Sequence, residues 1–189
     1  MKILTFAATA LAAAAILTAA TGNRQVTNNP KSPSAETSID LGGKKVIIEY
    51  NAPSARGRKV EGELIPYNEI YRMGADAATT LTTDTDLEIG ALRVPMGVYT
   101  LYLQARESGD WQLAVNKQTK QWGTVYNQDQ DLGRTPMKLT KLATPVERFK
   151  ITLTTKSAGI GELSVEWGHT KATVPVKQIT TGVPLGKIE

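Results

Sequence analysis

Basic, acidic and aromatic side chains gather in the stretch between residues 53 and 79 more densely than elsewhere in the chain. Guanidinium groups are planar forks that bind carboxylate, phosphate or sugar hydroxyl groups, and an aromatic ring adds a flat apolar surface. This combination predicts recognition of a glycan or a small anionic ligand, without a covalent bond being made or broken. The candidate ligand-binding residues are Arg56, Arg58, Tyr67, Arg72 and Asp76.

The same stretch allows two other interpretations. In a structural one, Arg72 forms an ion pair with Asp76 or Glu63 and pins a long loop over the end of the fold. In a catalytic one, Glu63 and Asp76 are the carboxylate pair of a metal-independent hydrolase. Acidic residues are common on any solvated sheet face, so the sequence does not select between these interpretations.

Composition excludes several other chemistries. The chain has no cysteine, which excludes thiolate nucleophiles, disulfides and cysteine metal sites, and its one histidine, His169, cannot form a multi-histidine metal centre. The segment 127–133 alternates oxygen-bearing side chains as a calcium loop does, but Lys138 stands where the closing glutamate belongs, so it is interpreted as a polar hairpin tip. No metal site and no cofactor is predicted.

Apolar residues alternate with polar ones at a period of two, which is typical of half-buried strands. Glycine- and proline-containing turns separate these runs, and Asn68–Ala78 is the one place where a short helix is expected. The pattern predicts an all-β, single-domain β-sandwich or jelly-roll-like antiparallel fold of eight to ten strands. The alternating runs are Val46–Tyr50, Tyr99–Leu103, Trp111–Val115, Phe149–Leu153 and Leu163–Trp167.

The N-terminal residues have the three regions of a secretory signal peptide: a short basic start, an alanine-rich apolar run and small residues before the cleavage site. We therefore expect a signal peptide over 1–22, a flexible linker over 23–38, the β domain over 39–178 and a C-terminal tail over 179–189. The expected location is periplasmic or extracellular, with no stable membrane anchor after cleavage. The net charge of +4, spread along the chain, does not favour nucleic acid as a partner.

Several motifs are similar to those of a known family. They are Pro53-Ser54-Ala55-Arg56-Gly57-Arg58, Gly62–Tyr67, Tyr71–Thr79 and the turn and strand Pro95–Leu101. Together they resemble the bacterial domain of unknown function 2911 family (DUF2911), over about residues 32–177. Tyr71 stands where that family usually has tryptophan, and Asp76 where it often has asparagine. The resemblance implies an exported, mostly β domain, and no activity.

These observations together predict an exported, non-catalytic binding or envelope-associated module whose ligand is a glycan or a small anion. The hydrolase that uses Glu63 and Asp76 remains the first alternative. The second is a structural partner in an envelope assembly, which would make its contacts through an exposed apolar patch or a strand edge. The sequence does not set the oligomeric state.

Overall fold

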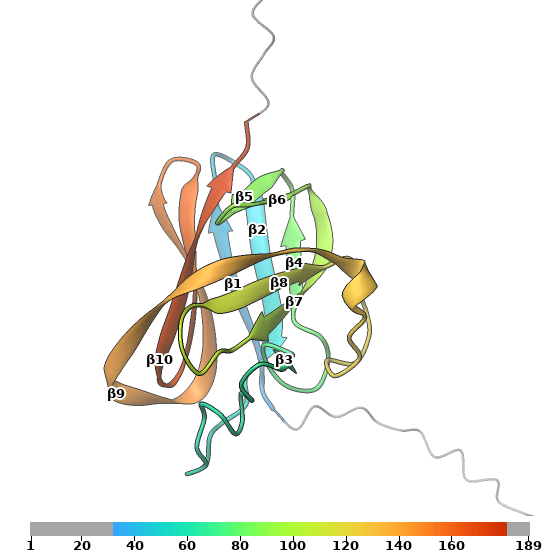
Figure 1. The fold of residues 1–189 in the computed structure, drawn as a ribbon. Coiled ribbons are helices and arrows are strands. Elements are labelled where there is room, and N and C mark those ends of the chain that lie inside the picture. Colours follow the sequence, from blue (N-terminus) through green and yellow to red (C-terminus); the bar gives the residue numbers. More distant parts are fainter. Residues whose placement is uncertain (1–31, 181–189) are drawn as a thin grey trace, which may run out of the picture.

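The structure, a computed structural model, describes residues 32–180 and confirms an all-β antiparallel fold (Figure 1). One 3-10 turn, η1 (Gln128–Gln130), lies among the strands. Within this part of the chain, no helix has the length and apolar character needed to cross a membrane. The strands are β1 (Ser34–Asp40), β2 (Lys45–Asn51), β3 (Ile70–Tyr71), β4 (Thr80–Thr83), β5 (Leu87–Ile89), β6 (Leu92–Val94), β7 (Gly97–Gln104), β8 (Trp111–Asn116), β9 (Asp131–Ser157) and β10 (Ile160–Gln178).

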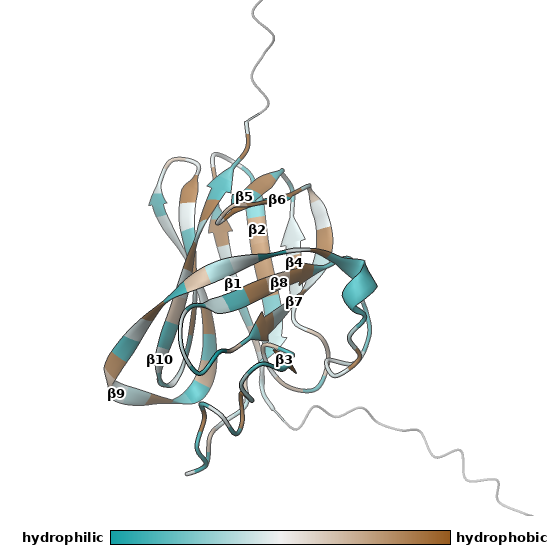
Figure 2. Cartoon of the chain, in the orientation of Figure 1, coloured by the Kyte–Doolittle hydropathy of each residue, from teal (hydrophilic) through white to brown (hydrophobic). Residues whose placement is uncertain are grey.

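The expected alternation of apolar and polar residues is visible along the strands (Figure 2). In β2, Val46, Ile48 and Tyr50 are buried, whereas Lys45 and Glu49 are exposed. Successive side chains of a strand point to opposite faces, so this spacing gives the strand one apolar and one solvated face. All five predicted alternating runs lie in strands, two of them inside the long strands β9 and β10.

The strands form one continuous sheet with the order β1-β2-β4-β7-β8-β9-β10-β5-β6, and β3 pairs with β7. Strand β9 pairs with β8 through residues 131–137 and, from Lys138 onward, with β10. The sheet folds over itself along these two long strands, and the returning part of β9 reaches β1, where the Leu153 N–H donates to Thr37 Oγ1 at 2.9 Å. The two layers of the predicted sandwich are therefore parts of one sheet.

Both layers contribute to one core that contains a cluster of four aromatic rings. Phe149 lies edge-on to Tyr50, Tyr71 and Trp167, with ring centroids 5.6–6.0 Å apart, and Tyr71 stacks on Trp167 at 6.2 Å. Such pairs contribute roughly 0.5–1.5 kcal/mol each beyond their buried area. The cluster joins β2, β3, β9 and β10, and it forms the base beneath the candidate site.

Two predictions, one about the linker and one about a short helix, are wrong. Strand β1 begins at Ser34, inside the expected linker 23–38, because its backbone pairs with β2 from Ser34 opposite Asn51 onward although few of its side chains are apolar. The expected short helix in Asn68–Ala78 is absent; that segment holds β3 and turns, with left-handed backbone at Met73 and Asp76. The predicted signal peptide, most of the predicted linker, and the tail beyond residue 180 lie outside the described residues.

Candidate functional site

The loop between β2 and β3 rests on the aromatic cluster. Its Ala55 N–H donates to the Glu147 carbonyl at 2.9 Å, and the Phe149 N–H donates to the Pro53 carbonyl at 2.8 Å, so the loop continues the edge of β9. Val60 and Ile65 are buried in the core. The loop is therefore a packed part of the domain and presents its polar side chains from a fixed backbone.

The two predicted arginines of this loop have different environments. Arg58 donates from Nε to the Ala55 carbonyl at 2.9 Å and from Nη2 to the Ser54 carbonyl at 3.1 Å, so two of its donors hold the turn of its own loop. Arg56 is exposed and has a left-handed backbone with φ of 53°, and its N–H donates to Glu147 Oε1 at 2.7 Å. Arg58 thus has a structural role, whereas the Arg56 guanidinium extends into solvent.

A groove of about 550 Å³ separates this loop from the middle of the β9–β10 hairpin. We call it the Tyr67 groove. It combines one aromatic ring, two lysines, one histidine, one glutamate and threonine hydroxyls. Its lining residues are Lys59, Glu61, Tyr67, Leu139, Thr140, Lys141, His169 and Thr170.

A β-bulge in β10 shapes one wall of the Tyr67 groove. The register shifts on both sides of Gly168, whose φ is 56° and whose position leaves no room for a Cβ, since that atom would lie 2.9 Å from Val60 Cβ and from Glu61 Oε1. Glu61 Oε1 accepts the His169 N–H at 3.1 Å and the Thr170 hydroxyl at 2.7 Å. Glu61 therefore fastens the loop to the bulge.

The bulge also turns the His169 side chain into the groove. Its Nδ1 lies 3.2 Å from the Leu142 carbonyl oxygen, an acceptor, so the geometry suits a proton on Nδ1. In the neutral ring this leaves Nε2 as an acceptor. In the protonated ring, Nε2 becomes a further donor beside the two lysines.

Arg72 and Asp76 belong to a different place. Arg72 donates from Nε to the Gly74 carbonyl at 3.2 Å. None of the ion pairs between residues 32 and 180 involves Arg72, so the predicted pair with Asp76 or Glu63 is wrong. Burial raises the pKa of the neighbouring Tyr71 phenol, and this outweighs the lowering by the Arg72 charge and by the hydrogen bond to the Gly74 carbonyl.

Asp76 lines a second recess, of about 430 Å³, beside the loop that connects β8 to β9. We call it the Trp122 hollow. Asp76 is 9% exposed, and its Oδ2 accepts the Ser32 N–H at 3.1 Å. Trp122, which pairs with Ala77 in an isolated bridge, is 44% exposed. The lining residues are Ser34, Asn51, Asp76, Ala77, Lys120, Gln121 and Trp122.

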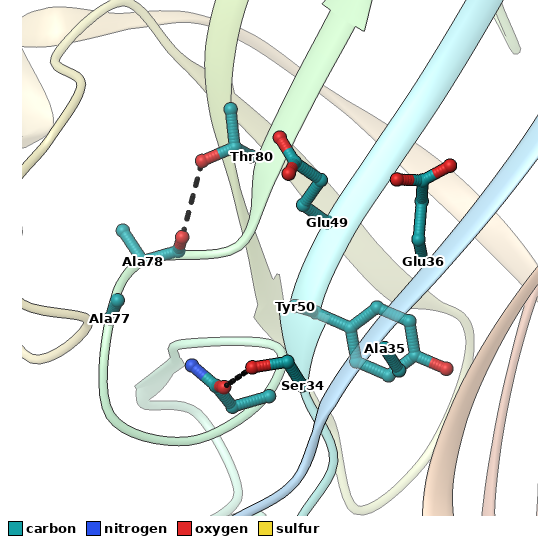
Figure 3. A pocket seen from close by; sticks show the side chains of 9 residues that line it. Ser34, Ala35, Glu36, Glu49, Tyr50, Ala77, Ala78 and Thr80 are labelled. Carbon is teal, nitrogen blue, oxygen red and sulfur yellow. Dashed lines mark hydrogen bonds between the residues drawn. The ribbon is translucent and has the colours of Figure 1, made fainter. Parts of the chain in front are cut away.

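A third recess, also of about 430 Å³, continues the Trp122 hollow across β1 and β2 (Figure 3). The two share Ser34, Asn51 and Ala77 among their lining residues. Figure 3 shows the carboxylates of Glu36 and Glu49 on these neighbouring strands, where the two residues are partners in the β1–β2 register. We call the combined recess the Trp122 trough.

Hydrogen bonds hold the β8–β9 loop against the outer face of the sheet. Asp131 Oδ2 accepts the Tyr126 hydroxyl at 2.6 Å and Arg134 Nε at 3.1 Å, and Asn116 Nδ2 donates to Asp131 Oδ1 at 2.8 Å. Burial, together with the negative charge and hydrogen bond of Asp131, raises the pKa of Tyr126 to about 12. The predicted polar hairpin tip at 127–133 is thus a 3-10 turn followed by the start of β9.

The predicted site residues therefore do not share one recess. Tyr67 lies in the Tyr67 groove, and Arg58 borders an adjoining recess that shares Lys59, Glu61 and His169 with that groove. Asp76 lines the Trp122 hollow, whereas Arg56 and Arg72 line none of these three recesses. Glu63, the proposed catalytic partner of Asp76, is exposed and lines neither recess.

Sequence reasoning missed the partners that come from distant strands. Lys141 lies in the middle of β9, where the sequence contains no turn signal to show that the strand bends toward the loop. His169 follows Trp167-Gly168, and a glycine inside an alternating strand pattern is a signal for a bulge. That signal was available, but the sequence alone did not show what the bulge faces.

The comparisons with known proteins identify a family without an assigned role. A family model described as "Protein of unknown function (DUF2911)" matches residues 32–176, which confirms the resemblance seen in the motifs. No curated protein and no solved structure matches the chain.

Proposed function

This chain belongs to the DUF2911 family of proteins of unknown function, and we propose that it is an exported, non-catalytic binding module that takes a small organic anion into the Tyr67 groove. The proposal refines the expected glycan or anion ligand of the 53–79 stretch. It retains Tyr67, adds Lys59, Lys141 and His169, and leaves Arg58 as a support of the loop.

The observation that carries the proposal is the pair of lysines in one groove. Lys59 comes from the loop and Lys141 from β9, and neither takes part in an ion pair between the described residues. The one carboxylate of the groove, Glu61, is already hydrogen-bonded by His169 and Thr170. Two cations beside an aromatic ring attract an anion that also has an apolar face.

The chemistry of the groove favours binding over catalysis. A hydrolase that works through a nucleophile needs a hydroxyl next to a base that is itself oriented by a third group. Here the Glu61 oxygen that accepts the Thr170 hydroxyl also accepts the His169 backbone N–H and so fastens the loop to the bulge, while His169 Nδ1 faces the Leu142 carbonyl and no hydroxyl. The alternative pair Glu63 and Asp76 does not share a recess, which leaves the hydrolase without a supporting geometry.

Isothermal titration calorimetry with citrate, galacturonate and inorganic phosphate tests the proposal. Two unit charges 4 Å apart interact by about 1 kcal/mol in water and about 4 kcal/mol near a protein surface. We therefore expect Lys59→Glu and Lys141→Glu each to weaken binding at least tenfold. The matched control Lys44→Glu, which changes an exposed lysine of the β1–β2 turn, should leave binding unchanged. Absence of saturable binding by all three anions, or equal losses in the control, would overturn the proposal.

Export is tested separately by mass spectrometry of the protein recovered from a bacterial host that expresses the complete chain. A signal peptide cleaved after Ala20 or Gly22 leaves a new N-terminus at Thr21 or Asn23. Recovery of the uncleaved chain from the cytosol alone would contradict export without affecting the binding proposal.

A further inference from the structure

We propose that the Trp122 trough is a second binding site, for an oligosaccharide that carries no acidic group. This site shares no lining residue with the Tyr67 groove, and the proposal does not depend on the anion site.

One of the three tryptophans is exposed. The protein has three, and Trp111 and Trp167 are only 4% and 3% exposed, with their indole N–H groups donating to the carbonyls of Arg106 and Glu147. Trp122 is 44% exposed and lines the hollow. A large aromatic face in water has no benefit for folding, whereas it stacks favourably on the C–H face of a sugar ring.

Trp122 is held in place although it is exposed. The Gly123 N–H donates to the Asp76 carbonyl at 2.9 Å, and the Ala78 N–H donates to the Gln121 carbonyl at 3.2 Å, on either side of the tryptophan. A Cβ at Gly123 would lie 2.9 Å from both Arg72 Cδ and the Asp76 carbonyl oxygen. The backbone therefore packs closely here, and the ring is presented on a fixed support, which lowers the entropy cost of binding.

Polar atoms with free hydrogen-bonding capacity lie in the same hollow as the Trp122 ring. Asp76 Oδ2 accepts the Ser32 N–H, and no group of residues 32–180 donates to Oδ1. Asn51 Oδ1 accepts the Ser34 hydroxyl at 3.1 Å, and within the same residues its Nδ2 donates to no acceptor. An acceptor and a donor next to an aromatic face match the hydroxyl groups of a sugar, which both donate and accept.

The trough carries an excess of negative charge, which disfavours the binding of acidic ligands. Glu36 and Glu49 lie opposite each other on β1 and β2, and neither forms an ion pair with another described residue. Like charges directly opposite in a sheet are destabilising, so their presence has a cost that folding does not explain. With Asp76 they outnumber the one lysine of the trough, Lys120, and they repel uronic or sulfated sugars.

The shape of the trough indicates an oligomer. Its two parts, each of about 430 Å³, meet at Ser34, Asn51 and Ala77, and each lies within the range of about 300–1,000 Å³ that is common for small-ligand sites. A chain of sugars would lie with one ring on Trp122 and continue over β1 and β2 toward Glu36 and Glu49. An apolar peptide is the competing occupant, but the polar strand surface offers it little to cover.

The test follows the indole N–H signals of the three tryptophans by NMR, using protein recovered after expression of the complete chain. The probes are cellohexaose, chitohexaose and maltohexaose, with hexagalacturonate as the acidic counterpart and an apolar hexapeptide as the competitor. We expect one neutral hexaose to shift the Trp122 signal saturably, the signals of Trp111 and Trp167 to stay in place, and hexagalacturonate to bind at least tenfold more weakly.

Variants locate the site and separate it from the Tyr67 groove. Trp122→Ala has no Trp122 signal, so its binding is measured by isothermal titration calorimetry, and saturable binding of the hexaose should be abolished. Asp76→Asn, which keeps an acceptor for the Ser32 N–H, should weaken binding at least fivefold. Val125→Ala removes another exposed apolar side chain of the same loop and should change nothing, as should Lys59→Glu. The proposal is overturned if no neutral hexaose shifts the Trp122 signal, or if only the peptide or hexagalacturonate shifts it. It is also overturned if Trp122→Ala binds the hexaose as tightly as the unmodified protein does.

Discussion

The two long loops that border the recesses are attached to the domain in contrasting ways. The loop between β2 and β3 buries Ala55, Val60 and Ile65 in the apolar core, next to the aromatic cluster. The loop between β8 and β9 adds no side chain to that core and is held to the outer face of the sheet by hydrogen bonds, mainly from Gln121, Tyr126 and their partners. One recess is therefore supported by apolar packing, and the other by polar contacts.

This difference determines how each recess responds to a change in pH. Apolar burial does not depend on protonation, so the β2–β3 loop is expected to stay in place until the whole domain unfolds. A hydrogen-bonded network around ionisable groups depends on pH and can open locally. The β8–β9 loop is therefore the part of the structure from which local opening is expected first.

Truncation of the apolar support should have the largest effect. Ile65 is fully buried, and Ile65→Ala is expected to lower the free energy of unfolding by about 2–5 kcal/mol because it removes buried surface and leaves a cavity. Urea denaturation followed by tryptophan fluorescence measures this loss. A loss below about 1 kcal/mol would show that the loop is not an integral part of the core.

Removal of Arg134 should have the next largest effect, confined largely to the β8–β9 loop. Its guanidinium donates to Asp131, to Tyr126 and, at 2.9 Å, to Gln104 Oε1. Arg134→Ala leaves the nearly buried Asp131 carboxylate without its cation, and a loss of about 2 kcal/mol is expected. Hydrogen exchange should show faster exchange at Gly123 and Val125 than in the strands. Uniform acceleration through the whole domain would contradict local opening.

A smaller effect, dependent on pH, is expected for Tyr126→Phe. A tyrosine in the unfolded chain ionises near pH 10, whereas the pKa of Tyr126 in the folded protein is about 12. Between these values the unfolded state has lost the proton that the folded state keeps, so the free energy of unfolding falls as the pH rises from 10 to 12. Phenylalanine lacks this contribution, so denaturation of Tyr126→Phe should show a less steep decline over that range. If the free energy of unfolding falls equally steeply with pH in Tyr126→Phe and in the unmodified protein, the raised pKa of Tyr126 is contradicted.

The smallest effect is expected where an ion pair is exposed and supports neither loop. Lys156 Nζ lies 3.1 Å from Glu162 Oε1 across the β9–β10 hairpin. The Lys156 side chain is 51% exposed and the Glu162 side chain 32% exposed. Lys156→Ala should change the free energy of unfolding by about 0–1 kcal/mol. The same denaturation measurement provides the baseline for Arg134→Ala, and an equal loss in both variants would show that the network adds nothing beyond one ion pair.

The sequence was sufficient for the fold class because alternation is a local signal. Val46, Ile48 and Tyr50 identify a strand without reference to any other part of the chain. The path of β9 was not predictable, since this strand of 27 residues pairs with β8 and then with β10, and only its part Phe149–Leu153 appears as an alternating run in the sequence. Strand β1 was missed because it is defined by backbone pairing with β2, and backbone pairing does not require a pattern of apolar side chains.

The candidate site was predictable only where its residues are close in sequence. Tyr67 and Asp76 were identified from their cluster, but they line separate recesses because the chain turns between them through Met73 and Gly74. Lys141 and His169 reach the Tyr67 groove by long-range strand pairing. The position of Trp122 next to Asp76 depends on its pairing with Ala77, which composition does not reveal.

The pairing of β10, the last strand, with the β5–β6 hairpin constrains the order in which the chain folds. Strands β5 and β6 pair with each other locally, but their attachment to the sheet requires residues 176–178 of β10. During synthesis the sheet therefore cannot be completed until almost all of the chain has emerged, and contacts so distant in sequence form slowly. The docking of residues 176–178 of β10 against β5 is therefore expected to be the last and slowest step of folding.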